Sequence, residues 1–290
     1  MKRQNEKLKS VIAFFITMLI TTTIFAQKPT IEWANIPAGT FTMGSPTSEA
    51  TREDFEIQHE VTLSAFKMSK YEVTVGQFKA FVDATGYVTD ADKGTGKING
   101  SSIWSGNKWK YKKGVNWKCD EKGNLRPVSD YNHPVIHVSW NDARAFADWM
   151  GCRLPTEAEW EYACRAGTTT PFNTGNCLSA DEANYDGNTP FNNCALGQFK
   201  DKTMPVGSYV ANAWGLFDMH GNVLEWCSDF AGPYPLEVQT NPLGPPSGES
   251  RVLRGGCWCD YAESCRSALR DNHDPDQRYD YIGFRLVSPD

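Results

Sequence analysis

The chain has 290 residues, of which 40% are hydrophobic and 12% are aromatic, and this is enough for a sizeable globular core. It carries 29 basic and 35 acidic residues, so its formal net charge at pH 7 is −6. We therefore expect no nucleic-acid partner, because phosphate binding needs a basic surface that this chain lacks.

Residues 1–26 predict a secretory signal peptide. The segment begins with the basic MKRQNEKLK, continues with the uncharged VIAFFITMLITTTIFA, and offers Ala26 as a cleavage site. A membrane anchor is the alternative, although the apolar run is short for a span of about 20 residues. Cleavage removes four basic residues and one acidic residue and leaves a net charge near −9. We expect an exported protein, periplasmic or secreted, with no stable membrane span after signal removal.

Residues 30–288 are expected to form one domain, because no internal repeat or low-complexity linker divides them. Alternating polar and apolar residues at 31–45, interrupted by proline and glycine, predict a pair of strands. Residues 71–86 then predict a strand followed by a short amphipathic helix that ends at Gly86.

Two further helices are marked clearly in the sequence. The apolar run at 133–138 predicts a short strand, and the helix that follows it ends at Gly151. Thr156 and Glu159 have the spacing of a capping box at the start of the next helix, which ends at Gly167. The remaining chain is rich in turn-forming residues, with 24 glycines and 16 prolines in all. The pattern predicts an α+β domain with little regular secondary structure.

Seven segments suggest a family relationship, and in chain order they are IPAGTFTMGS, YEVTVGQF, HPVIHVSWNDA, CRLPTEAEWEYACRAG, AWGLFDMHGNVLEW, RGGCW and IGFRLV. Together they resemble the formylglycine-generating enzyme (sulfatase-modifying factor) family over about residues 31–288. The resemblance implies a single domain with a variant of the C-type lectin fold, often with bound calcium. It does not settle the chemistry, because the family includes a copper-dependent thiol oxidase of sulfatases and members without known activity.

The oxidase members of this family place two cysteines at the fourth and ninth positions after a Gly-Gly pair, and two such thiolates suit Cu(I). After Gly255-Gly256 this chain has Cys257, Cys259 and Cys265, at the first, third and ninth positions. Cys265 matches by count, whereas Cys259 comes one residue early. The candidate catalytic residues are Cys259 and Cys265, with copper and O2 implied by the resemblance. A buried or disulfide-bonded role is the alternative.

The segment DMHGNVLE offers hard oxygen ligands of the kind that Ca2+ prefers. The resemblance implies calcium at this segment and at a second site upstream. The candidate ligands are Asp218, Gly221, Val223 and Glu225 in the first site, and Asn184 and Tyr185 in the second. A glycine turn capped by acidic residues is the alternative interpretation of the first site.

Two other pairs of residues could form a disulfide or bind a metal ion. Cys177 and Cys194 flank a loop rich in Asn and Gly, and we expect a disulfide there, because closing such a loop stabilises the fold by roughly 3 kcal/mol. His133 and His137 have the H-x3-H spacing of some zinc sites. On a strand the two rings would lie about 13 Å apart, so we expect structural roles for both.

The C-terminal segment mixes arginines with aromatic residues. Arg254, Trp258 and Arg270 are candidates to line a cleft for an anionic or peptide ligand, and buried ion pairs are the alternative use of the arginines. Two functions therefore stay open. One is an exported oxidoreductase that acts on a protein cysteine or a small molecule, and the other is a non-catalytic binding or structural module of the cell envelope.

Overall fold

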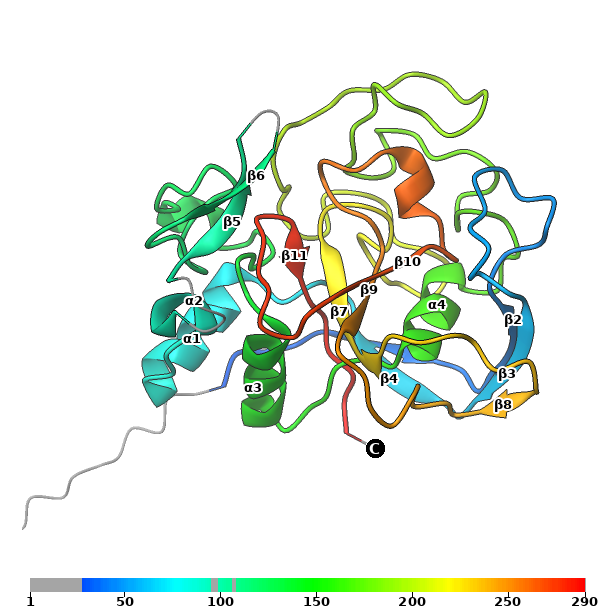
Figure 1. Cartoon of the computed structure of the whole chain (residues 1–290), viewed down its shortest axis with the longest axis horizontal. Helices are drawn as coiled ribbons and strands as arrows, with labels where there is room; N and C mark the ends of the chain where they lie inside the picture. Colours follow the sequence, from blue (N-terminus) through cyan, green and yellow to red (C-terminus); the bar gives the residue numbers. More distant parts are fainter. Residues whose placement is uncertain (1–27, 95–98, 106–107, 290) are drawn as a thin grey trace, which may run out of the picture.

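Short strands and helices are joined by long irregular segments, as the glycine and proline content predicts (Figure 1). The computed structural model describes residues 28–94, 99–105 and 108–289. The predicted signal peptide at 1–26 lies outside the described residues. Within the described ranges, no helix is both long and apolar enough to cross a membrane.

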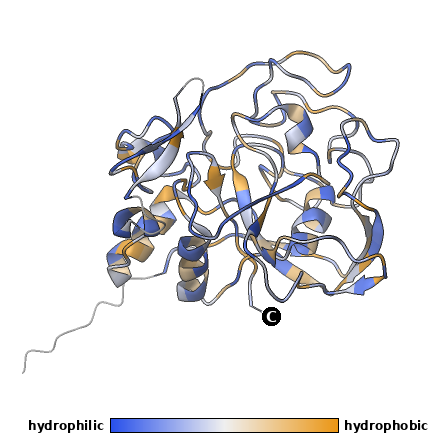
Figure 2. Cartoon of the chain, in the orientation of Figure 1, coloured by the Kyte–Doolittle hydropathy of each residue, from blue (hydrophilic) through white to orange (hydrophobic). Residues whose placement is uncertain are grey.

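A four-stranded sheet with the order β10-β9-β7-β11 forms the centre of the domain. Its strands are β7 (Leu224–Phe230), β9 (Arg251–Arg254), β10 (Arg270–His273) and β11 (Ile282–Gly283). β9 is antiparallel to both β7 and β10, and β11 is parallel to β7. Figure 2 shows hydrophobic residues at β11 and at the start of β7, in the middle of the molecule. The cysteine-rich segment 255–269 connects β9 to β10 and is therefore anchored to this sheet at both ends.

Three smaller sheets surround the central one. They are β1 (Trp33–Ile36) with β4 (Phe66–Ser69), β2 (Gly39–Met43) with β3 (His59–Leu63) and β8 (Gln239–Thr240), and β5 (Ser101–Trp104) with β6 (Trp109–Lys112). The predicted strands at 31–45 both form, but they do not pair with each other. Only Pro37 and Ala38 separate them, and a proline is unsuited to the positive-φ turn of a two-residue hairpin. The chain therefore passes from one sheet into the next.

The helices are α1 (Val75–Thr85), α2 (Asp90–Lys93), α3 (Trp140–Met150) and α4 (Glu157–Arg165), with 3-10 turns at Val128–Asp130 and Ala262–Cys265. Thr74, Ser139 and Thr156 begin α1, α3 and α4 with complete capping boxes, including the box predicted for α4. α1 and α3 end at the predicted glycines. α4 ends one residue early, because Ala166 takes the left-handed conformation with a φ of 45°.

The predicted strand at 133–138 does not form. His137 has a φ of 62°, which interrupts an extended run. The His133 ring shares a 2.9 Å hydrogen bond with the Thr203 hydroxyl, and the His137 ring shares one of 2.9 Å with the Ser101 hydroxyl. Burial lowers the pKa of His137 to about 4, so its ring is neutral. These partners support structural roles for both histidines.

Candidate functional site

The segment between β9 and β10 turns sharply at its start. Gly255 and Gly256 have φ angles of 106° and 70°, a region that favours glycine. A Cβ added to Gly256 would lie 2.6 Å from the sulfur of Cys265, so a side chain at this position would displace the cysteine. The two glycines therefore let the segment fold back closely over Cys265.

This turn brings two of the three nearby cysteines into contact. The sulfur atoms of Cys257 and Cys259 lie 3.3 Å apart. Cys265 is fully buried in a separate cluster with Phe172 and Leu178. The structure thus places Cys259 beside Cys257, and catalysis by Cys259 with Cys265 stays a prediction. The spacing C-x-C was the sequence signal for this contact, and counting from the Gly-Gly pair overlooked it.

The protonation of the two thiols follows from their burial. Burial raises the pKa of the Cys257 thiol well above its usual value. At Cys259 the hydrogen bond with Cys257 lowers the pKa, but burial and the charge of Asp260 outweigh it, so the net shift is upward. The Asp260 carboxylate also accepts a 3.1 Å hydrogen bond from the Cys257 backbone N–H and so holds the turn. We expect both thiols to be protonated at neutral pH unless a soft metal binds them.

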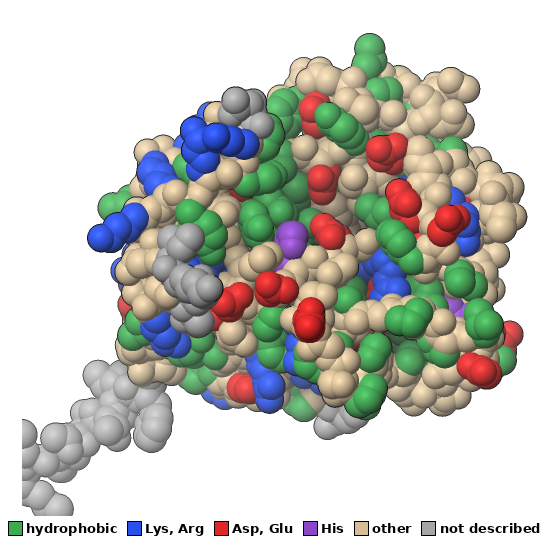
Figure 3. All heavy atoms as spheres, viewed as in Figure 1, with side chains coloured by type: hydrophobic (Ala, Val, Ile, Leu, Met, Phe, Trp, Pro, Cys, Tyr) green, Lys and Arg blue, Asp and Glu red, His purple; other side chains and the backbone are tan. Residues whose placement is uncertain are grey.

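A wall of aromatic rings stands beside the thiols. Cys257 and Cys259 belong to the same packed cluster as Tyr279 and Tyr281. The Tyr281 ring centroid lies 4.7 Å from that of Trp109 on the β5–β6 hairpin, and Trp109 is 38% exposed. Figure 3 shows hydrophobic side chains gathered beside this hairpin, whose outer surface carries basic residues. The wall therefore connects the buried thiols to an exposed aromatic surface, which the sequence analysis did not single out.

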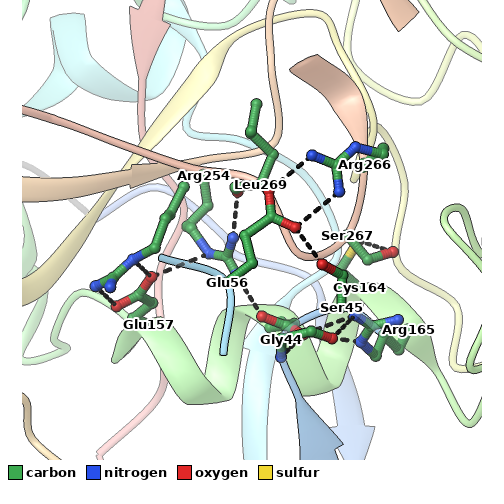
Figure 4. A network of polar contacts seen from close by, with 12 residues as sticks. Gly44, Ser45, Glu56, Glu157, Cys164, Arg165, Arg254, Arg266, Ser267 and Leu269 are labelled. Atoms are coloured by element: carbon green, nitrogen blue, oxygen red, sulfur yellow. Dashed lines mark hydrogen bonds and ion pairs between the residues drawn. The ribbon is translucent and has the colours of Figure 1, made fainter. Parts of the chain in front are cut away.

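The three residues predicted to line a ligand cleft lie in different surroundings. Arg254 is fully buried and pairs with Glu161. Figure 4 shows its other contacts, with Glu157 at 3.6 Å and with the carbonyl oxygen of Leu269. Trp258 is only 2% exposed. Arg270 lines a cavity. The prediction that it contacts a ligand stays a prediction.

The two predicted calcium segments meet in space. Asn184 and Gly221 form a parallel bridge, so the turn that carries Asp218 lies against the segment of Asn184 and Tyr185. The buried Oδ1 atoms of Asp218 and Asn184 have no hydrogen-bond partner among the described residues. The side chain of Tyr185 points elsewhere, because its hydroxyl donates to the carbonyl of Leu178 at 2.7 Å.

Glu225, the fourth predicted ligand of the first calcium site, is already engaged. Its carboxylate oxygens accept hydrogen bonds from Arg285 at 2.6 and 2.7 Å and from the Trp160 indole at 2.8 Å. Glu72 is instead the carboxylate that faces Asp218, and its Oε2 atom has no partner. Burial, followed by the charge of Asp218, raises the pKa of Glu72 well above its usual value. In the part of the chain that the structure describes, no three His, Cys, Asp or Glu side chains gather as a metal site.

The predicted disulfide between Cys177 and Cys194 is present, with the two Cα atoms 5.7 Å apart. It joins residues that are 17 positions apart, so it reduces the conformational entropy of the unfolded chain and thereby stabilises the fold. The other seven cysteines are free thiols.

The fold and the cysteine turn define a single-domain α+β protein of the C-type-lectin-like class. The family model described as the sulfatase-modifying factor enzyme 1-like domain matches residues 22–289. The chain belongs to the formylglycine-generating enzyme (sulfatase-modifying factor) family.

Curated relatives and solved structures agree with this assignment. The chain is 36% identical over 287 residues to the formylglycine-generating enzyme of Bos taurus, covering 90% of this chain and 75% of the relative. It is 38% identical over 285 residues to that of Streptomyces coelicolor, covering 87% and 88%. The structure of PvdO from Pseudomonas aeruginosa aligns with a TM-score of 0.67 at 29% identity, over 90% of this chain and 95% of PvdO.

Proposed function

We propose that this protein is an oxidoreductase that acts on a cysteine of a protein or peptide substrate. The contact between the Cys257 and Cys259 sulfurs, in the turn after Gly255-Gly256, is the observation that carries the proposal. It is supported by the similarity to formylglycine-generating enzymes at 36–38% identity. The aromatic wall of Trp109 and Tyr281 gives a substrate segment a surface on which to lie beside the thiols.

The two sulfurs suit Cu(I), which prefers thiolate ligands, and Cys257 and Cys259 would hold it. Bound copper would supply the activation of O2 beside a substrate thiol. The protein itself holds the two sulfurs in place. The Asp260 carboxylate fixes the turn through the Cys257 N–H, and the burial of Cys257 keeps water away from the sulfur. Tyr281 packs in the same cluster as the two thiols, and a 3.2 Å contact between its hydroxyl and the His273 ring holds it in place.

Copper protection of the thiols tests this proposal. We expect Cu(I) to protect Cys257 and Cys259 from alkylation, as read by mass spectrometry of the folded, signal-free protein. Cys257→Ser and Cys259→Ser are each expected to weaken copper binding by more than about 100-fold, because losing only a residue that hydrogen-bonds to a metal ligand already costs about 10–100-fold in metal affinity. Cys152→Ser, which removes a partly exposed thiol elsewhere, is the matched control and should bind copper normally.

The variant Cys265→Ser separates the two possible thiol pairs. It should keep copper binding if Cys257 and Cys259 are the ligands. If it loses copper while Cys257→Ser keeps it, the pair is Cys259 with Cys265. Normal copper binding by all three variants, or none by the wild type, would contradict the oxidoreductase proposal and favour a binding module.

We also propose a calcium ion held by the carboxylates of Asp218 and Glu72 with the carbonyls of Gly221 and Val223. The support is chemical, because two buried carboxylates that face each other with unpartnered oxygens need either a proton or a cation between them. Asn184 and the carbonyl of Tyr185 would form the second site. Glu225 is left out of the ligand set, since Arg285 occupies both of its oxygens.

Calcium is therefore expected to stabilise the fold. At a free concentration of 100 times Kd, binding should add about 2.7 kcal/mol to the free energy of unfolding, and EGTA should remove this gain. Asp218→Asn should remove the stabilisation that this first site contributes, whereas Asp148→Asn, at an exposed carboxylate on α3, should retain it. Thermal unfolding with and without calcium measures the effect, and identical melting temperatures for the wild type in both conditions would refute the site.

Export of the chain is a further part of the proposal. The disulfide between Cys177 and Cys194 supports it, because such bonds persist mainly in oxidising compartments such as the periplasm or the extracellular space.

A further inference from the structure

The cavity that Arg270 lines has a volume of about 380 Å3 and lies between β3, the start of α4 and the segment 232–245. Much of its wall is apolar, with Met43, Ala158, Pro233, Pro242 and Leu243 among the lining residues. Figure 3 shows basic and histidine side chains set among hydrophobic ones on the surface over these elements. None of the residues assigned to the thiol site or the calcium sites lines this cavity.

The charged groups of one wall neutralise each other. Glu157 and Arg270 form an ion pair, with Arg270 Nη2 2.6 Å from Glu157 Oε2. The Tyr234 hydroxyl donates to Glu157 Oε1 at 3.0 Å, and the Arg270 guanidinium lies 4.0 Å from the centre of the Tyr234 ring. His59 packs against the same tyrosine, with the ring centroids 4.7 Å apart. The ion pair of Glu157 with Arg270 therefore adds no net charge to this wall.

Asp229 is a carboxylate of the cavity that forms no salt bridge with the residues that the structure describes. It is 4% exposed, and its Oδ2 atom accepts hydrogen bonds from the Glu157 backbone N–H and the Ser228 hydroxyl, both at 3.0 Å. The Oδ1 atom receives no hydrogen bond from the described residues. Gly244 lies directly over it, because a Cβ added there would be 2.9 Å from Oδ1. Asp229 is nevertheless one of the residues that line the cavity.

We propose that this cavity binds a small organic cation, a primary amine with an apolar body, with Asp229 as its counter-ion. The proline and leucine walls would bury the apolar body, and the ammonium group would donate to Asp229 Oδ1. An anionic ligand would meet the Asp229 carboxylate in a poorly solvated site, which disfavours it. This binding function is independent of the thiol chemistry proposed above.

Binding should depend on pH in the range where Asp229 titrates. Burial, followed by the charge of Glu157, raises the pKa of Asp229 to about 7. The ionisable groups that face it or share the cavity are Glu157, Glu159, Arg251, Arg270, His59, Tyr234 and Cys227. Below this pKa the carboxyl is neutral while the amine stays protonated, so affinity should fall as the pH falls from 8 to 6.

Benzylamine is a suitable probe, with uncharged benzyl alcohol and anionic benzoate as ligands of similar shape. Calorimetry on the folded protein at pH 8 should show benzylamine binding at least ten times more tightly than either of the other two. Asp229→Asn should weaken benzylamine binding by at least tenfold, because the amide can still accept the Glu157 N–H but carries no charge. Asp271→Asn, at an exposed position on β10, is the matched control and should bind benzylamine normally.

Several results would overturn the proposal. These are the absence of benzylamine binding by the wild type, equal affinity for benzyl alcohol, or unchanged affinity in folded Asp229→Asn. If that variant does not fold, the wild-type pH series decides, since an affinity that is flat between pH 6 and 8 rules out Asp229 as counter-ion. Copper protection of Cys257 and Cys259 should be the same in Asp229→Asn, so failure here is distinct from failure of the oxidoreductase proposal.

Discussion

Replacement of Arg285 by methionine is expected to lower the free energy of unfolding by about 3–5 kcal/mol. Arg285 and Glu225 are both fully buried, and two hydrogen bonds of 2.6 and 2.7 Å join them. The guanidinium also donates to the carbonyl of Phe217 at 2.9 Å. Methionine would fill much of the volume but leave Glu225 as an uncompensated buried charge. Urea denaturation at pH 7 measures the loss.

Two further variants test whether the loss of stability in Arg285→Met comes from the buried charge of Glu225. Arg144→Met breaks an exposed ion pair with Asp148 and should change stability by less than about 1 kcal/mol. Combining Arg285→Met with Glu225→Gln removes the buried charge and should recover part of the loss. If Arg285→Met lowered the free energy of unfolding as little as Arg144→Met, solvent would have to reach the pair of Arg285 and Glu225.

The helices could be predicted because their signals are local. A capping box such as Thr156 with Glu159 joins residues three positions apart, so the sequence alone contains both partners. The disulfide was predictable for a similar reason, since Cys177 and Cys194 flank one loop and no other cysteine lies between them. The left-handed Ala166 at the end of α4 carried no such signal, because alanine seldom adopts that conformation.

Partners that are distant in sequence account for the features that the sequence analysis missed. Glu225 offers the same oxygen chemistry to calcium and to arginine, and only the fold shows that Arg285, 60 residues away, takes both oxygens. Glu72 faces Asp218 across a still longer separation, so nothing near either residue in the sequence indicated the contact. For Arg254 the sequence left a buried ion pair open as the alternative, and only the fold identifies the partner as Glu161 on α4.

The contact between Cys257 and Cys259 depends on the conformation of the turn. Counting positions after Gly255-Gly256 does not give the path of the backbone, which turns sharply here because both glycines adopt positive φ. Cys257 and Cys259 consequently meet, while Cys265 faces a different cluster. A path of this kind depends on how the turn packs, and a motif match does not specify it.

Phe78→Ala is the second change with a large expected effect, about 3–5 kcal/mol of unfolding free energy. Phe78 is fully buried on α1, and its ring centroid lies 5.5 Å from that of Trp117, 5.8 Å from that of Phe146 and 6.4 Å from that of Phe284. These rings join α1, α3 and the segment after β11, and their rigid packing limits how far a cavity can collapse.

Denaturant unfolding should therefore show a lower midpoint with an unchanged slope in the Phe78 variant. Leu125→Ala, at a side chain that is 75% exposed, is the matched control and should change stability by no more than about 0.5 kcal/mol. A loss at Phe78 as small as that at Leu125 would mean that α1 is not held by this cluster.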